Sequence, residues 1–479
     1  MSLHRMGALM GAYSLVGLGF ASVVVVSQRF LPYPAPQASR PALTQPGQTP
    51  LPSATPGGSD TVATETDPYD NLETVLDLLH DDYLSPINER KLFAESFRLL
   101  KEYLKSQKVD VKDFPNLPEK LNDRKSLTMA WKSMIERTEA RVKDKFDRRK
   151  LVYLGLKAML GGLNDPYCAV LEPREYRIFE EHMAGGNFSG IGVMIELDRD
   201  HDNRVTVSQP IDGSPASGAG IKSGDVLQAI DGKPTKGWDI EKAANHIRGP
   251  KGSTVVLTVL RPSEKKTLKI SVVRDMIHVR SCTSKMAAPK VGYLQVQVFG
   301  GETGKEFEEE VEKVRAKGAE ALIIDLRNNG GGYVNAAIEI CSHFVPKGER
   351  IVSVVNPRLS RSDEHVSLGL EEIKWPTVVL VNRFSASASE ITAGCFQDHK
   401  RGKLIGETTF GKASVQQVEN LADGGAFKYT VAHYLTPSGK DIHRKGIKVD
   451  IPVKVTENDK DDKVLEAAVK ALKSQLPKS

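Results

Sequence analysis

Two runs of apolar residues in the second half of this chain set the tightest limit on its fold. Residues 321–326 (ALIIDL) and 377–382 (TVVLVN) are apolar almost throughout and do not alternate with polar residues. Such runs are typical of strands that other elements cover on both faces. Since strand-like and helical stretches follow one another from about Val291 onward, the sequence predicts an α/β layer in this half of the chain.

The helix expected between residues 299 and 321 has a predicted start. Thr303 and Glu306 have the spacing of a capping box, in which each side chain bonds to the other residue's backbone. The apolar side of this helix consists of Phe307, Val311 and Val314. A last amphipathic helix near the C-terminus carries Leu465, Val469 and Leu472.

The length of 479 residues suggests about three domains at roughly 150 residues each. After Tyr69 the apolar residues recur at helical spacing, as at Leu72, Val75, Leu76 and Leu79. Later the pattern changes to strands and glycine turns, and Asp231-Gly232 is a hairpin signal. We therefore expect a multidomain protein of mixed α+β and α/β class. The expected divisions are a membrane anchor or signal segment at 1–29, a disordered linker at 30–68, a helical region at 69–180, a small β domain at 186–275, an α/β core at 276–455 and a terminal helix at 456–479.

The N-terminal segment has the length of a membrane span. Gly7 to Val26 is a run of 20 uncharged residues, and a helix of that length crosses a bilayer core. No small-residue cleavage signal follows it, which favours a retained anchor over a cleaved signal peptide. The residues after it are rich in Pro, Ser and Thr and are expected to form a flexible stalk. The sequence thus predicts a body tethered to a membrane.

Composition and charge exclude several classes of protein. A content of 40% hydrophobic and 27% charged residues is ordinary for a globular chain. The net charge of +5 is spread over the whole length without aromatic residues interleaved, so nucleic acid is not an expected partner. The four cysteines are far apart and form no C-x-x-C pair, which indicates packing residues rather than metal ligands or disulfides.

Two small-residue turns are candidates for chemistry. Residues 325–332 (DLRNNGGG) end in three glycines that allow a sharp turn and leave backbone N–H groups free. Residues 385–390 (SASASE) follow the second apolar run and precede a helix, where N–H groups and the helix dipole favour a developing oxyanion. A serine at this turn is a candidate nucleophile, and simple N-capping is the alternative.

A serine nucleophile requires a base, and Lys412 is the candidate. It lies among small and apolar residues, where loss of solvation would lower the pKa of its amine. The alternative is a surface lysine on a loop. The same loop misses the nucleotide-binding pattern because Ala413 stands where a Ser or Thr is required. No H-E-x-x-H zinc motif and no G-x-S-x-G motif occurs, so we expect no metal and no cofactor.

Residues 381–394 and 406–416 together resemble the C-terminal processing, or tail-specific, serine peptidases, and the likeness extends over roughly residues 70–455. The resemblance implies that Ser387 is the nucleophile, that Lys412 is the base and that Gln416 orients the lysine. It also implies a crotonase/ClpP-like α/β protease core. Residues 325–332 are similar to the family's D-L-R-x-N-x-G-G segment. This implies that Gly331, or alternatively Gly332, joins the N–H of Ala388 in an oxyanion hole.

The resemblance also implies a PDZ domain. Residues 188–193 are similar to the family's carboxylate-binding loop, which assigns peptide binding to Gly190, Ile191, Gly192 and Val193. Such a loop offers backbone donors to a C-terminal carboxylate while a strand edge pairs with the peptide. Residues 248–252 are similar to the segment in which an arginine, here Arg248, is thought to couple this domain to the active site.

The expected function is therefore a serine endopeptidase that cuts exported proteins near exposed, apolar C-termini. The rival is a catalytically inactive PDZ adaptor that delivers tails to another protease. Ala413 stands where the family usually has glycine, and it would strain the loop if that position required positive φ. The expected location is the extracytoplasmic side of a membrane, in the periplasm or cell envelope, or outside the cell if the N-terminal segment is cleaved. The membrane, an activating adaptor and self-association are further expected partners.

Overall fold

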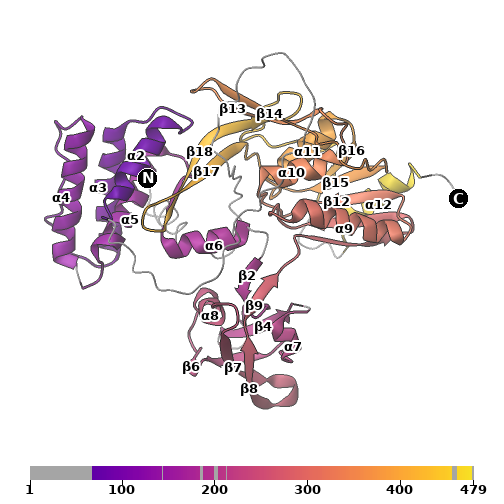
Figure 1. Ribbon diagram of the computed structural model, residues 1–479, viewed down its shortest axis with the longest axis horizontal. Coiled ribbons are helices and arrows are strands. Elements are labelled where there is room, and N and C mark those ends of the chain that lie inside the picture. The colour runs from indigo at the N-terminus through magenta and orange to yellow at the C-terminus, as the bar shows by residue number, and fades with distance from the viewer. Residues whose placement is uncertain are drawn as a thin grey trace, which may run out of the picture.

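The computed structural model describes residues 67–142, 144–183, 187–198, 203–211, 213–455 and 461–476. The expected anchor at 1–29 and nearly all of the expected linker at 30–68 lie outside these residues. Among the residues described, no helix combines the length and apolarity that crossing a membrane requires. Figure 1 shows a helical region at one end, an α/β core at the other and a small β domain projecting below them.

The helical region is built from amphipathic helices with short connections. These are α2 (Asp70–Asp81), α3 (Glu89–Ser106), α4 (Arg124–Val142) and α5 (Arg148–Met159), followed by the 3-10 turn η1 (Leu160–Leu163). The predicted apolar face of α2 is confirmed, because Leu72, Val75, Leu76 and Leu79 are all buried. Farther along, α6 (Pro173–Met183) leads toward the small β domain.

The small β domain has a hydrophobic core of its own. Its strands are β3 (Val193–Asp198), β4 (Arg204–Pro210), β5 (Val226–Ile230), β6 (Lys233–Pro234), β7 (Thr254–Arg261) and β8 (Lys266–Val273), with helices α7 (Pro215–Gly218) and α8 (Ile240–Ile247). The main strand order is β3-β4-β5-β7-β8. The predicted hairpin turn is confirmed, since Asp231 and Gly232 join β5 to β6 with φ of 49° and 76°. The core of this domain is a cluster separate from the other two clusters of buried apolar residues.

The chain enters and leaves the small β domain through paired strands. β2 (Asn187–Gly190) and β9 (Asp275–His278) form an antiparallel two-stranded ribbon. The ribbon connects α6 on the entry side to the first strand of the α/β core on the exit side, as Figure 1 shows. The two ends of the domain therefore lie next to each other.

The α/β core is a six-stranded sheet. Its order is β10 (Cys282–Ala288), β11 (Val291–Val296), β12 (Ala321–Asp325), β15 (Thr377–Val381), β16 (Gly402–Gly406) and β19 (Ile451–Pro452). Only the β10–β11 pair in this sheet is antiparallel. Every residue of β12 and β15 is buried, which confirms the α/β layer predicted from the two apolar runs.

Helices cover both faces of this sheet. α9 (Thr303–Ala316), α10 (Val334–Ser342) and α11 (Ala388–Asp398) pack on one face, and α12 (Lys463–Lys473) packs on the other. The buried face of α12 consists of Val464, Ala468 and Leu472, whereas Leu465 and Val469 are only partly buried. The capping box predicted at the start of α9 is wrong, because the Glu306 carboxylate accepts hydrogen bonds from Ser281 and Cys282 instead.

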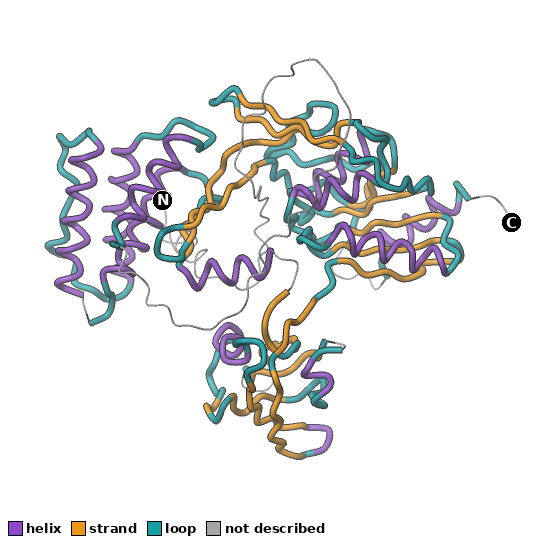
Figure 2. The backbone as a smooth tube through the Cα atoms, in the orientation of Figure 1, coloured by secondary structure: helices purple, strands orange, loops and turns teal. Residues whose placement is uncertain are grey.

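A second sheet joins the helical region to the α/β core. Its order is β1 (Ala169–Leu171), β18 (Ala426–Leu435), β13 (Arg350–Asn356) and β14 (Arg361–Val366), and β17 (Ser414–Asn420) also pairs with β18. Figure 2 shows the long β17–β18 hairpin running between the two parts. One continuous hydrophobic cluster extends from α2 through this hairpin to β12 and β15. The four cysteines are all buried and form no disulfide, as expected of packing residues.

Ile323 tests the packing of the sheet against α12. Its side chain is fully buried in the cluster between the sheet and this helix. We expect Ile323→Ala to lower the free energy of unfolding by about 2–5 kcal/mol, because the lost apolar contacts leave a cavity. Urea unfolding of the full chain measures this change. Met129→Ala is the control, since Met129 is 63% exposed on α4 and its truncation should change the free energy little. Equal effects of the two substitutions would contradict this packing.

Candidate active site

The three serines of residues 385–389 have different surroundings. Ser385 Oγ donates to the Leu326 carbonyl at 2.8 Å, and Ser389 Oγ donates to the Asn329 carbonyl at 2.9 Å. Both flanking hydroxyls therefore fix this turn to the glycine turn. The buried Ser387 Oγ has no hydrogen-bond partner among the described residues, so the side-chain N-cap that we considered as an alternative does not form.

Ser387 also has an unusual backbone conformation. It lies at the start of α11 with φ of 63° and ψ of −119°. A non-glycine residue rarely adopts positive φ, and such a conformation costs on the order of 1–3 kcal/mol. Strained turns between a strand and a helix are a known way to present a nucleophile. The local geometry thus has a feature expected of a reactive serine.

The buried carboxylate of Glu390 connects the serine turn to the lysine loop. One of its oxygens accepts from the N–H of Ser387 at 2.9 Å and from the N–H of Lys412 at 2.8 Å. The other accepts from the N–H of Gly411 at 2.7 Å and from the hydroxyl of Thr409 at 2.6 Å. Two segments that are distant in sequence are therefore held together by one side chain.

Tyr434 makes a second connection between the same segments. Its buried hydroxyl lies 3.1 Å from the Ser387 carbonyl and 2.8 Å from the Lys412 carbonyl. Sequence reasoning assigned no role to Glu390 or Tyr434. Glu390 nevertheless follows Ser387 by three residues, which is the spacing of a capping box and was a usable signal. Burial raises the pKa of the Glu390 carboxyl, although four hydrogen bonds favour its ionised form.

Lys412 is buried, and the alternative of a surface lysine is wrong. Its side chain is 1% exposed, and its Nζ has no hydrogen-bond partner among the described residues. The Nζ lies 4.7 Å from the centroid of the Tyr167 ring. Burial first, and then the charge of Lys428, lowers the pKa of the Lys412 amine well below its ordinary value. A neutral amine at this position is a competent general base.

Ala413 does not strain the lysine loop. Its φ is not positive, whereas the positive φ in this loop belongs to Gly411, at 87°. The alanine is fully buried and packs in the main hydrophobic core. The substitution of the family's usual glycine is therefore compatible with this backbone.

Gln416 lies on β17 at a β-bulge, where the strand pairing with β18 shifts by one residue. Its Nε2 donates to Thr430 Oγ1 at 3.3 Å, and its Oε1 is buried without a partner in the described part of the chain. A hydroxyl, an amine and an amide oxygen, on Ser387, Lys412 and Gln416, are thus all buried and unpartnered. They are not hydrogen-bonded to one another in this structure.

The glycine turn lies directly against Ser387. A Cβ on Gly331 would be 2.7 Å from Ser387 Cβ, and the φ of 102° at Gly331 also requires glycine. The N–H of Gly331, which we expected in the oxyanion hole, donates to Asn329 Oδ1 at 2.8 Å and is therefore occupied. Within the residues described, the N–H groups of Gly332 and Ala388 donate no hydrogen bond. Gly332, the alternative, is thus the glycine with a free donor.

The expected carboxylate-binding loop lies in the small β domain. Gly190 ends β2, Val193 begins β3, and Ile191 is buried between them. The carbonyls of Ile191 and Gly192 accept hydrogen bonds from the N–H of Ala216 and of Ile211, respectively. The N–H groups of Ile191 and Gly192 donate no hydrogen bond in the part described, so the loop presents donors rather than acceptors.

The elements beside this loop are an edge strand and a helix, the two that a bound peptide strand would contact. β3 is an edge strand of its sheet, and α8 packs beside it. Arg248 is half-buried at the end of α8, where its N–H donates to the Ala244 carbonyl. Its coupling role stays a prediction. No group of three or more His, Cys, Asp or Glu side chains suited to a metal ion occurs within the described ranges.

Comparison with known proteins relates both parts of the chain to families. Residues 290–453 match the model of peptidase family S41, and residues 182–260 match that of the PDZ domain. The chain is 36% identical to the carboxy-terminal processing protease CtpA of Bacillus subtilis over 315 residues, which is 65% of this chain and 66% of that protein. It is 38% identical to the carboxyl-terminal-processing protease of Picosynechococcus over 317 residues, 64% of this chain and 76% of that protein.

The chain therefore spans just under two thirds of the length of the Bacillus relative. Among solved structures, it is similar to a photosystem II D1 C-terminal processing protease with 28% identity and a TM-score of 0.42, over 81% of this chain and 98% of that one.

The burial of Lys412 should cost stability in a pH-dependent way. In the unfolded chain this lysine is charged below about pH 10.4. In the folded chain burial lowers its pKa, so the amine stays neutral down to a lower pH than it does in the unfolded chain. The folded state thus binds fewer protons, and stability falls as the pH drops from that value toward the lowered folded pKa. We expect Lys412→Met to raise the melting temperature, and to raise it more at pH 7 than at pH 10.

Lys403→Met is the matched control for this measurement, because Lys403 is exposed on β16. Calorimetry at the two pH values should show no comparable gain for the control. If Lys412→Met gives the same gain at pH 7 and at pH 10, Lys412 is not neutral in the folded protein.

Proposed function

Since this chain belongs to peptidase family S41, we propose that it is a serine endopeptidase that recognises protein C-termini and cleaves close to them. Ser387 is the nucleophile and Lys412 is the general base. The observation that carries this assignment is the set of unpartnered, buried polar atoms on Ser387, Lys412 and Gln416. A buried polar group without a partner is costly, so its retention indicates a role outside folding.

The first step is proton transfer. Neutral Lys412 takes the proton of the Ser387 hydroxyl while Oγ attacks the scissile carbonyl of the substrate. The lowered pKa of Lys412 supports this role, because a lysine with its ordinary pKa would be protonated at neutral pH. Nζ now lies over the Tyr167 ring and must turn toward Ser387. Gln416 Oε1 is a free acceptor that can hold the amine in the new position.

The second step is stabilisation of the tetrahedral intermediate. The free N–H of Ala388, at the start of α11, and an N–H of the glycine turn form the oxyanion hole. Gly332 supplies this donor as the turn stands, and Gly331 supplies it only after its bond to Asn329 breaks. The protonated lysine then returns its proton to the leaving amine, and water hydrolyses the acyl-enzyme.

The small β domain selects the substrate. The free N–H groups of Ile191 and Gly192 bind the C-terminal carboxylate, and the tail adds as a strand to the edge of β3. Substrates are therefore proteins with an exposed, apolar C-terminus. We also propose that the uncharged segment at residues 7–26 tethers the enzyme to a membrane, with its catalytic body on the extracytoplasmic side.

Substitution of the two proposed catalytic residues tests the mechanism. We expect Ser387→Ala and Lys412→Ala each to lower the rate of cleavage of an unstructured C-terminal tail by at least about 1000-fold. Mass spectrometry of the products measures the rate and the cleavage position. Lys403→Ala, on the exposed side of β16, should retain the wild-type rate. Wild-type rates in both catalytic variants would rule out the mechanism, and peptide binding without any cleavage by the wild type would favour the adaptor.

The rate should also depend on pH in a definite direction. The base is active only when neutral, so kcat should fall as the pH is lowered through the pKa of Lys412. Because that pKa is well below the ordinary lysine value, activity should persist at neutral pH. A pH–rate profile checks this. Activity that appears only near the ordinary lysine pKa, at about pH 10, would contradict a buried, neutral base.

A further inference from the structure

Tyr167 lies beside the proposed base although it comes from a distant part of the chain. The Nζ of Lys412 lies 4.7 Å from the centroid of the Tyr167 ring. Tyr167 comes shortly before β1, which pairs with β18 and thereby attaches the helical region to the second sheet. The proposed mechanism uses this ring only as the place that Nζ leaves. The helical region thus supplies a side chain whose role in the active site is unassigned.

The turn that carries Tyr167 is held in place by its own hydrogen bonds. Asn164, at the end of η1, has a φ of 54° and starts the turn. Asp165 Oδ1 accepts from the N–H of Tyr167 at 2.9 Å, and Asp165 Oδ2 accepts from the hydroxyl of Tyr83 at 3.3 Å. The next residue, Cys168, is fully buried. The ring therefore has a defined position beside the lysine.

The amine of Lys412 lacks a partner for the charge that the reaction places on it. The proposed first step moves the hydroxyl proton of Ser387 to Nζ and leaves an ammonium there. Within the described residues this Nζ has no hydrogen-bond partner. The two carboxylates whose charges favour the ammonium, Asp165 and Glu390, already accept hydrogen bonds from other donors. A buried ammonium without a partner is costly, so the ring beside it is informative.

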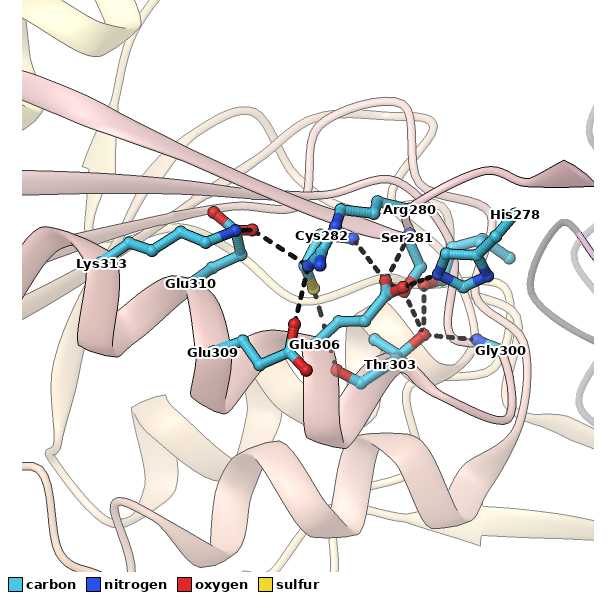
Figure 3. A network of polar contacts seen from close by, with 11 residues as sticks. His278, Arg280, Ser281, Cys282, Gly300, Thr303, Glu306, Glu309, Glu310 and Lys313 are labelled. Carbon is cyan, nitrogen blue, oxygen red and sulfur yellow. Dashed lines mark hydrogen bonds and ion pairs between the residues drawn. The ribbon is translucent and has the colours of Figure 1, made fainter. Parts of the chain in front are cut away.

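Glu306 of α9 shows how this protein accommodates a buried charge that is permanent. Its carboxylate accepts from the N–H and hydroxyl of Ser281 and from the N–H of Cys282 (Figure 3). Burial alone would raise the pKa of Glu306, but its hydrogen bonds outweigh burial and lower it. Lys412 has no comparable set of partners. The surroundings of Lys412 therefore suit a charge that exists for only part of the reaction.

An aromatic ring is a suitable partner for such a temporary charge. The face of a tyrosine ring carries partial negative charge and attracts an ammonium that lies within about 6 Å of the ring centroid. The attraction is strongest where water is excluded, and the Lys412 side chain is only 1% exposed. A carboxylate in the same place would favour the ammonium at all times and would remove the neutral base. The ring stabilises the ammonium without adding a negative charge.

Three charged groups act on Lys412 from the elements packed around it. Lys428 of β18 disfavours the ammonium, whereas Asp165 of the turn before Tyr167 and Glu390 of α11 favour it. Burial has a larger effect than any of these charges and lowers the pKa of the Lys412 amine. All three groups stay in place when Tyr167 is replaced, so a comparison of Tyr167 variants isolates the ring.

The tyrosine hydroxyls near Lys412 add no charge of their own. Burial first, and then the charges of Asp165 and Glu390, raise the pKa of the Tyr167 hydroxyl, while Arg444 opposes them. Burial also raises the pKa of the Tyr434 hydroxyl on β18. Both rings are therefore neutral phenols in the pH range in which the enzyme is expected to act.

Resting on the function proposed above, we propose that Tyr167 is a positioning residue whose ring holds the Lys412 amine and stabilises the ammonium formed when Ser387 attacks. In that step the hydroxyl proton of Ser387 moves to Nζ, Oγ bonds to the scissile carbonyl carbon, and the carbonyl oxygen becomes the oxyanion. The positive charge on Nζ lasts until the proton passes to the leaving amine. Tyr167 acts through Lys412 and not on the substrate.

Graded replacement of the Tyr167 ring tests this role in the full chain. Tyr167→Leu should lower kcat for an unstructured C-terminal tail about tenfold or more, and the conservative Tyr167→Phe should restore most of that loss. Phenylalanines with one, two and three ring fluorines at this position have nearly the same shape, but each fluorine weakens the negative charge on the ring face. We expect kcat to fall stepwise along this series. Equal kcat values for all the fluorinated forms would show that the ring only fills space and would overturn the proposal.

A titration of Lys412 tests the same interaction without cleavage. The full chain with Ser387→Ala is labelled with carbon-13 at the lysine Cε atoms, and NMR follows the signal that disappears in Lys412→Met. Tyr167→Leu should lower the pKa of Lys412 by about one unit, because the ring no longer favours the ammonium. Tyr167→Phe should leave this pKa close to the value with tyrosine. The same pKa in the leucine variant would contradict the proposal.

Tyr103→Leu is the matched control for both measurements. Tyr103 is another half-buried tyrosine of the helical region, but its ring lies beside Phe146. Its replacement should change neither kcat nor the pKa of Lys412. Should Tyr167→Leu fail to fold, the fluorinated series decides the test, because it keeps the ring. If the wild type cleaves no tail, the proposed function fails, and the titration still decides whether the ring stabilises the ammonium.

Discussion

The carboxylate of Glu390 is the interaction on which the active site depends. Ser387 follows β15 and Lys412 follows β16, so the two residues come from separate segments of the chain. Four donors converge on one buried carboxylate, and two of them are the backbone N–H groups of the proposed nucleophile and base. Tyr434 repeats this connection from β18 through the two carbonyls. These bonds fix the backbone of Ser387 and Lys412 and leave the Oγ and Nζ atoms without hydrogen bonds. A preorganised site needs this combination of a fixed backbone and available reactive atoms.

Several features of this site oppose folding. Ser387 has positive φ, Lys412 gives up the hydration of its charge, and polar atoms on both residues lack partners. Each feature is destabilising by itself, and together they make a site that the surrounding core must support. That support is visible in the continuous hydrophobic cluster running from α2 through β17 and β18 to β12 and β15. The small β domain has a separate hydrophobic core and lies outside this cluster.

The regular elements were predictable because their signals are local. The runs that became β12 and β15, the apolar face of α2 and the turn at Asp231-Gly232 follow from spacing alone. The burial of Lys412 could not be predicted from its neighbours alone, because a lysine between small residues can have the same local sequence in a loop and in a core. The capping box predicted at Thr303 does not form, because the Glu306 carboxylate accepts from the N–H groups of Ser281 and Cys282. These partners are distant in sequence, so local spacing could not reveal them. Likewise, the hydrogen bond from the Gly331 N–H to Asn329 depends on the backbone conformation of the turn. A glycine-rich sequence is compatible with several such conformations and does not specify one.

The paired strands β2 and β9 have a consequence for how this protein could have been assembled. The first and last strands of the small β domain are paired, and the domain has its own hydrophobic core. The whole domain could therefore be inserted, deleted or replaced without disrupting the sheet that precedes Ser387. A replacement domain would only need to join the same two neighbouring ends of the chain. Attachment of the small β domain and integrity of the sheet that carries the proposed nucleophile are therefore separate properties of this chain.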